Sequence, residues 1–185
     1  MTGAMITFDI DVSELLRLAA AIPALAQALD EEGGKAMEDS GMMLTLMVKG
    51  RMTAEHGVNY GTLRSSISWP QGFEKQGSLL DTLRGIVGAS NMMSGSGMST
   101  STYVWYVEEG TSPHWPPAGP LKLWALRKFG DERIGYMVQR SIAAKGTRGV
   151  HMFQRAWDEG GQAGVERIWG QVAVKAVARF EKAAS

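Results

Sequence analysis

The feature that most constrains the fold is a run of prolines in the second half of the chain. Four of the six prolines lie between Gly110 and Pro120. Proline fixes φ and has no N–H to donate to a helix or a sheet. We therefore expect residues 111–120 to form a proline-rich loop without regular structure, and we expect the regular elements on either side of it.

Helical periodicity dominates the N-terminal part of the chain. Asp11 is predicted to cap a helix, and Glu14 completes a capping box three residues later. Apolar residues then recur at helical spacing as far as Leu29. Pro23 is expected to kink or split this helix, and Gly33–Gly34 is expected to end it.

A second helix is predicted over residues 35–52. Its apolar side chains follow one face, which we interpret as a core face because methionine fills irregular gaps in packed interiors. This face comprises Met37, Ser40, Leu44 and Met47, with Met43 and Val48 beside it.

Strand-like segments occupy the middle of the chain. Residues 63–69 and 83–89 are predicted strands, and Tyr103–Val107 is the strongest candidate because it is aromatic and β-branched throughout. Residues 90–102 are rich in Gly, Ser and Met. We expect them to form a flexible loop, because such a sequence cannot bury enough surface to order itself.

Helices are predicted again after the proline-rich loop. A short helix over residues 121–129 ends at Gly130, and a second covers residues 134–144. After a turn at residues 145–149, a long helix is predicted over residues 150–182. Three glycines near its middle predict a bend or break there.

Together these elements predict an α+β fold, with a small antiparallel β-sheet packed by N-terminal helices and a long C-terminal helix. The chain has 185 residues, of which 44% are hydrophobic and 21% charged, as in a single globular domain over residues 1–185. No apolar run has the length of a membrane span, and no signal peptide is expected.

The sequence contains no recognisable catalytic or cofactor-binding motif. It has no cysteine, which excludes disulfides, thiol catalysis and Cys-based zinc sites. Its three histidines, His56, His114 and His151, have no second ligand at metal spacing. Glu108 and Glu109 would point to opposite faces of a strand, so their carboxylates would not converge. We therefore expect a protein that is not an enzyme, with no metal and no cofactor.

Charge is distributed unevenly along a chain whose net charge is zero. Residues 1–60 carry −5, residues 61–119 carry −1 and residues 120–185 carry +6. Either the helices simply differ in surface charge, or copies of the chain present complementary faces to one another. The basic residues within 120–155 fit a solvated surface and, as an alternative, a nucleic-acid contact.

Loop and aromatic residues are the best candidates for contact with a partner. Exposed aromatic side chains beside prolines suit an interface because they lose little entropy on docking, although Trp115 and Trp124 would equally fit a lid packed on the sheet. The candidate interface comprises Met92, Met93, Met98, Glu108, Glu109, His114, Trp115, Trp124 and Arg148.

Three segments in the same order resemble a known family. They are Gly61-Thr-Leu-Arg-Ser-Ser-Ile67, Tyr103-Val-Trp-Tyr-Val-Glu-Glu-Gly-Thr111 and Lys145-Gly-Thr-Arg-Gly-Val-His-Met-Phe-Gln-Arg-Ala-Trp157. This order resembles the tail-completion, or head–tail joining, proteins of long-tailed bacteriophages, the family that includes minor tail protein Z of lambdoid phages. There, a G-x-L-R-x-S-I segment precedes a Y-V-E-x-G-T strand, and a G-T-x-G-x-x-F turn opens the last helix.

The resemblance implies a structural virion protein. It implies a ring, commonly of six copies, at the head-proximal end of the tail, assembled in the host cytoplasm. The neighbours would be the head connector or closure protein and the tail terminator or tail tube, with DNA passing through the channel. A tail-terminator or head-closure subunit, a small nucleic-acid-binding module and a hydrolase with an unrecognised site remain alternatives.

Overall fold

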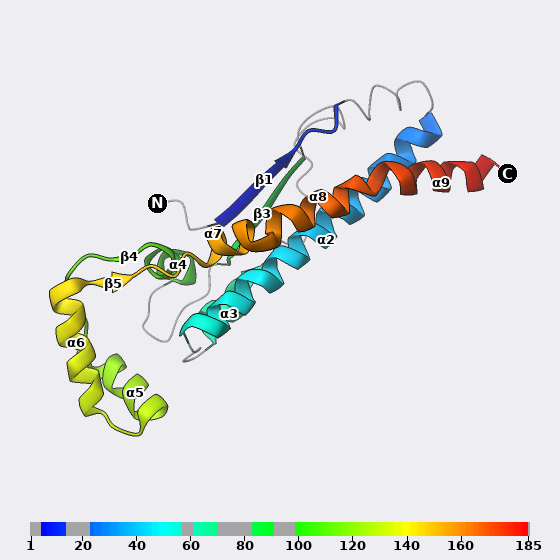
Figure 1. Ribbon diagram of the computed structural model, residues 1–185. Helices are drawn as coiled ribbons and strands as arrows, with labels where there is room; N and C mark the ends of the chain where they lie inside the picture. Colours follow the sequence, from blue (N-terminus) through cyan, green and yellow to red (C-terminus); the bar gives the residue numbers. More distant parts are fainter. Residues whose placement is uncertain (1–4, 14–22, 57–60, 70–82, 91–98, 185) are drawn as a thin grey trace. The chain divides into compact units, whose positions relative to one another are not determined.

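The computed structural model describes residues 5–13, 23–56, 61–69, 83–90 and 99–184. Its elements are β1 (Met5–Ile10), α2 (Pro23–His56), α3 (Thr62–Ser66), β2 (Ile67–Ser68), β3 (Leu83–Ala89), α4 (Thr100–Glu109), β4 (Gly110–Thr111), α5 (Ala118–Phe129), α6 (Arg133–Lys145), β5 (Thr147–Arg148), α7 (Met152–Ala156), the distorted segment η1 (Trp157–Gly161), α8 (Gln162–Gly170) and α9 (Val172–Ala184) (Figure 1). They confirm the predicted α+β class: the chain is mostly helical, with small antiparallel sheets.

The chain divides into two compact units, which we describe separately. The long-helix unit contains the described residues of Met5–Arg51, Ile67–Gly88 and Phe153–Ser185. The hairpin unit contains those of Met52–Ser66 and Ala89–Met152.

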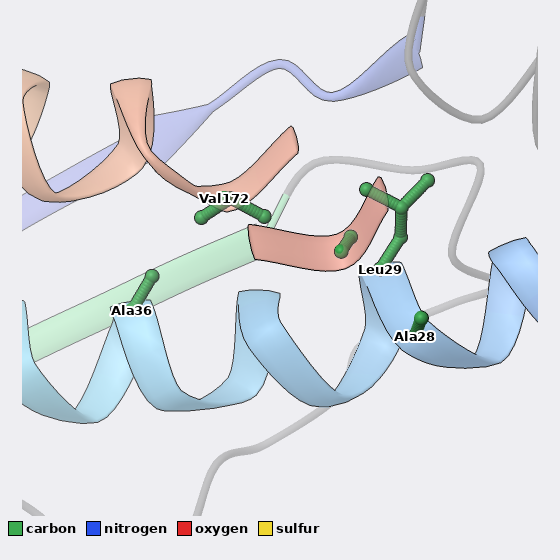
Figure 2. Close-up of a cluster of buried hydrophobic side chains, with 5 residues drawn as sticks. Ala28, Leu29, Ala36 and Val172 are labelled. Atoms are coloured by element: carbon green, nitrogen blue, oxygen red, sulfur yellow. The ribbon is translucent and has the colours of Figure 1, made fainter. Parts of the chain in front are cut away.

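Helix α2 is continuous, so the predicted end at Gly33–Gly34 is wrong. Pro23 is the first residue of α2, a position at which the helix needs no N–H. Residues 14–22 lie outside the described residues, so the predicted kink or split at Pro23 stays a prediction. The helix passes through both glycines because packing along its length outweighs their low helix propensity. Ala28, Leu29 and Ala36 of α2 form a buried cluster with Val172 and Ala176 of α9 (Figure 2).

The contact between α2 and the C-terminal helices extends along α8 in the antiparallel direction (Figure 1). A Cβ on Gly164 would lie 2.5 Å from Met43 Sδ, so glycine at this position lets the two helices approach closely. The predicted core face of α2 is confirmed: Met37, Ser40, Leu44 and Val48 are fully buried, and Met43 and Met47 are half-buried.

A three-stranded sheet in the order β1-β3-β2 completes the long-helix unit. Strand β3 confirms the prediction for residues 83–89 and pairs antiparallel with β1, in a register that places Ile6 opposite Val87. Both of these side chains are buried. Phe8 stacks on Trp69 and on Trp157, each with a ring-centroid distance of 6.4 Å.

Two predicted strands are helices in the structure. The predicted strand over residues 63–69 begins inside α3 and contains only the two-residue strand β2. Leu63 and Ser66 are both buried and lie one helical turn apart, so burial in this segment follows a helical period. Tyr103–Val107 lies within α4, which begins at Thr100, so the prediction of a loop is wrong for residues 100–102. Residues 91–98 of that predicted loop lie outside the described residues. The buried side chains of α4 recur every four residues, and this helical burial overrides the β-propensity of the aromatic residues.

The C-terminal part follows the predictions more closely. Helix α5 is closed by Gly130, whose φ is 75° and whose N–H donates to Leu126 O, and α6 covers the predicted residues 134–144. Helix α5 already begins at Ala118, because Pro120 is tolerated in a first turn. The predicted break occurs at Gly160, with φ 136°, and a second, unpredicted one separates α8 from α9.

At the N-terminal side, the predicted helix cap is partly described. The backbone N–H of Ser13 donates to Asp11 Oδ1 at 2.9 Å, and this hydrogen bond lowers the pKa of the Asp11 carboxyl. Residues 14–22, with Glu14 and most of the first predicted helix, lie outside the described residues. Within the described part, no helix combines the length and the apolar character needed to cross a bilayer.

Candidate interaction surface

Helix α4 has one buried face, and aromatic side chains are exposed on its other faces. Thr100, Val104 and Glu108 recur at four-residue spacing and are at most 5% exposed. The exposed residues are Tyr103, Trp105 and Tyr106, at 39%, 46% and 38%. Desolvation by its neighbours raises the pKa of the Tyr103 hydroxyl, although part of the side chain reaches solvent.

Hydrogen bonds through Ser90 connect the first residue of α4 to the last residue of α3. Thr100 Oγ1 donates to Ser90 O at 2.5 Å, and the backbone N–H of Ser90 donates to Ser66 O at 2.8 Å. These bonds satisfy groups at the end of α3 and the beginning of α4, so the two short helices form one hydrogen-bonded assembly.

The end of α4 joins a short antiparallel ladder between β4 and β5. Gly110 pairs with Arg148 and Thr111 with Thr147, and the two threonine hydroxyls are 2.9 Å apart. Gly110 and Gly146 have φ of 83° and 74°, a region that favours glycine. A Cβ on Gly146 would lie 1.9 Å from Thr111 O, so both the turn and the close approach require glycine.

Helices α5 and α6 pack against each other through small residues. Ala125 is fully buried, and Gly135 lies so close to α5 that a Cβ there would be 2.8 Å from the backbone of Lys122. Lys122 Nζ is 3.6 Å from a Glu132 carboxylate oxygen and 5.0 Å from the ring centre of Tyr136. A hydrogen bond with Tyr136 and, next, the charge of Glu132 raise the pKa of Lys122.

Large apolar side chains remain on the outward faces of this helical hairpin. Leu123, Leu126, Phe129, Tyr136 and Met137 are between 48% and 70% exposed. Exposed arginines alternate with them at spacings of three and four. We call the outward set the hairpin surface: Leu123, Leu126, Arg127, Arg133, Tyr136, Met137 and Arg140.

The candidate interface residues fall into different environments. Trp115 is 70% exposed, so it is not a lid, and His114 is also exposed, with Nδ1 2.9 Å from Ser112 O. Trp124 is half-buried and packs edge-on against Phe129 at 5.4 Å, with Lys128 Nζ 5.7 Å from its ring centre.

The remaining candidates separate by burial. Glu109 and Arg148 are exposed, whereas Glu108 is buried. Met92, Met93 and Met98 lie outside the described residues.

The hairpin surface itself was not predicted from the sequence. Its leucines and Met137 have helical spacing, which ordinarily indicates a core face. The sequence signal for this surface is the small size of Ala125 and Gly135. Small residues let two helices approach closely, so they indicate that the faces with Ala125 and Gly135 meet and that the leucines and Met137 point outward.

Among residues 5–13, 23–56, 61–69, 83–90 and 99–184, no three His, Asp or Glu side chains are grouped so that they could hold a metal ion. Chemically, the described surface offers aromatic, aliphatic and guanidinium groups, which are suited to binding a protein or a polyanion. No protein-family model, curated protein or solved structure matches this chain.

Proposed function

We propose that this chain is a structural subunit of a bacteriophage neck. Copies of it would form a ring, commonly of six, at the head-proximal end of the tail, complete the tail and join it to the head connector, with DNA as passing cargo. The protein would act in the virion, after assembly in the host cytoplasm, without a catalytic role or a cofactor.

One observation carries the proposal: parts of the three segments that resemble tail-completion proteins meet within the hairpin unit. The Thr-Leu-Arg-Ser-Ser part of the first segment is α3, which packs on α4. The second segment is α4 and β4, and the Thr-Arg of the third is β5, which pairs with β4. Segments far apart in the sequence thus build one local assembly, as expected if the motifs serve one common structure.

The character of the surface also supports an assembly role. Five large apolar side chains of α5 and α6 are between 48% and 70% exposed, and exposed apolar side chains that gather on one element mark interaction sites. Trp115 and Trp105 add exposed aromatic groups, which are enriched in protein interfaces.

Deleting the coding sequence from the genome that carries it, followed by electron microscopy of the particles, tests the proposal. We expect filled heads and separate tails, with joining restored by the wild-type gene supplied in trans. Normally joined particles without the chain would refute a role in joining. A particle reconstruction with the chain as a lone copy, without self-contact, would refute the ring.

Within the neck, a tail-terminator or head-closure subunit is the alternative position. The two differ in the deletion phenotype: a terminator mutant gives tails of uncontrolled length, whereas a joining mutant gives tails of normal length. The basic side chains of α5 and α6 also support a nucleic-acid-binding module. Binding to DNA that weakens steeply with added salt would favour that function.

A further inference from the structure

Two exposed apolar faces of opposite charge have no cover within the described chain. One is the hairpin surface, on a segment of residues 118–148 that carries seven basic and two acidic residues. The other lies on α2, whose residues 23–56 carry three basic and six acidic residues. We define this α2 face as Glu38, Asp39, Met42 and Leu46.

The α2 face lies on solvent-facing turns of its helix. Met42 and Leu46 are 47% and 70% exposed, and both carboxylates are exposed. Neither Glu38 nor Asp39 forms an ion pair with another described residue. The spacing of four between Glu38, Met42 and Leu46 aligns them along one stripe.

We propose that the α6 part of the hairpin surface of one copy, with Arg133, Tyr136, Met137 and Arg140, binds the α2 face of a second copy. This inference rests on the proposed function, because a closed ring of identical subunits needs a head-to-tail contact between two different surfaces. The contact joins two copies and does not depend on how the two units lie within one copy.

Chemistry and size favour this pairing. Arg133 can oppose Glu38 and Asp39 in charge, while Met137 can cover Met42. Arg133 lies about 6 Å from Met137 along α6, and Glu38 lies about 6 Å from Met42 along α2, at about 1.5 Å per residue. Exposed leucine and methionine disfavour a nucleic-acid ligand for this surface, because phosphates offer them no apolar partner.

Paired charge reversals test the contact directly. One variant carries Arg133→Glu and Arg140→Glu, and the other carries Glu38→Arg and Asp39→Arg. Native mass spectrometry and sedimentation at low salt should show wild-type self-association and a loss of about tenfold or more for each variant alone, because like charges then meet. An equimolar mixture of the two variants should regain association, since each offers the surface that the other lacks.

A matched control reverses two exposed charges outside both surfaces. The Arg167→Glu, Lys175→Glu variant should associate like wild type, and all variants should melt like wild type. Failure of the mixture to regain association would overturn the proposal, as would wild-type protein that stays monomeric at millimolar concentration. Loss of binding to a fluorescent DNA duplex by the hairpin variant, with self-association unchanged, would assign the hairpin surface to nucleic acid.

Failure of this pairing is distinguishable from failure of the neck role. A particle reconstruction with a ring built through other surfaces would refute the pairing and leave the neck role intact. Joined particles after deletion of the gene would refute the neck role, whatever the variants do in solution.

Discussion

Two helix pairs in this molecule use their side chains in opposite ways. Where α2 packs on the C-terminal helices, Leu44 is fully buried, and Gly161 and Gly164 leave room for Leu44 and Met43. Where α5 packs on α6, the buried positions are Ala125 and Gly135, and large residues such as Leu123 and Met137 are exposed. The first pair is therefore a folding core, whereas the second leaves large apolar side chains on its surface, which we propose to contact a partner.

The largest expected effect concerns the core of the first pair. Leu44→Ala removes a side chain with no exposed surface and should lower the free energy of unfolding by about 2–5 kcal/mol, through lost burial and the cavity left behind. Leu46→Ala, two residues away at a site that is 70% exposed, is the control and should change it by less than about 0.5 kcal/mol. Chemical denaturation measures both, and equal losses would contradict the assigned face.

The second prediction concerns the backbone that connects α6 to β5. Gly146→Ala introduces a Cβ at φ 74° and against Thr111 O, so we expect a loss of about 2–3 kcal/mol from strain and displacement of the β4–β5 ladder. Gly119→Ala is the control, because a Cβ at this position would meet no atom within 4 Å. Thermal melting of the two variants compares them, and a Gly146→Ala protein as stable as the control would refute the required conformation.

The third prediction uses pH to probe the ion pairs between α9 and α2. Arg179 pairs with Glu31, and its Nη1 is 3.2 Å from Glu32 Oε1. The hydrogen bond from Lys35, and after it Arg179, lower the pKa of the Glu32 carboxyl below its ordinary value of 4.5, against an opposing effect of burial. Because the folded-state pKa is lowered, this stabilisation is present above pH 4.5 and is lost as the pH falls through the folded-state value.

Arg179→Met should therefore lower the free energy of unfolding by up to about 1 kcal/mol at neutral pH. The effect is small because solvent screens the charge of the partly exposed Arg179. The difference in the free energy of unfolding from wild type should shrink as the solution is acidified through the lowered pKa of Glu32. Arg167→Met, at an exposed position of α8, should show no such pH-dependent difference. Urea unfolding at several pH values measures the effect, and a constant difference at every pH would contradict the electrostatic origin.

The sequence predicts elements whose signals are local. Strand β3 contains the β-branched residues Ile86 and Val87, and α5 ends at a glycine with a left-handed φ, so the sequence predicts both elements. Helix α4 was missed because its buried edge contains Thr100 and Glu108, which do not look like core residues. The continuity of α2 depends on contacts with residues more than 100 positions away, and no local pattern reveals them.

The hairpin surface also combines a property that the sequence shows with one that depends on tertiary contacts. The excess of positive charge after residue 120 is a property of the sequence, and the structure places much of it on the exposed faces of α5 and α6. The exposure of Leu123 and Met137 depends on which face of each helix meets the other, so helical spacing alone assigns them to a core.

A smaller effect tests the continuity of α2. Gly34 lies within the helix, and a Cβ added there would meet no atom within 4 Å, so alanine fits without displacement. Gly34→Ala should raise the free energy of unfolding by about 0.5–1 kcal/mol through its higher helix propensity. Thermal melting checks this, and destabilisation would indicate a helix that ends at the glycine pair.

The smallest effect on folding separates the two kinds of surface most sharply. Met137, Leu46 and Val174 are each 70% exposed, so replacing any of them with serine should change the free energy of unfolding by no more than about 0.5 kcal/mol. Met137 and Leu46 belong to the two faces proposed to meet between copies, whereas Val174 belongs to neither. Sedimentation should therefore show weaker self-association for the first two variants and wild-type behaviour for the third. Equal weakening by all three would mean that exposed apolar area in general drives association, and the contrast between a folding core and a reserved docking face would then be lost.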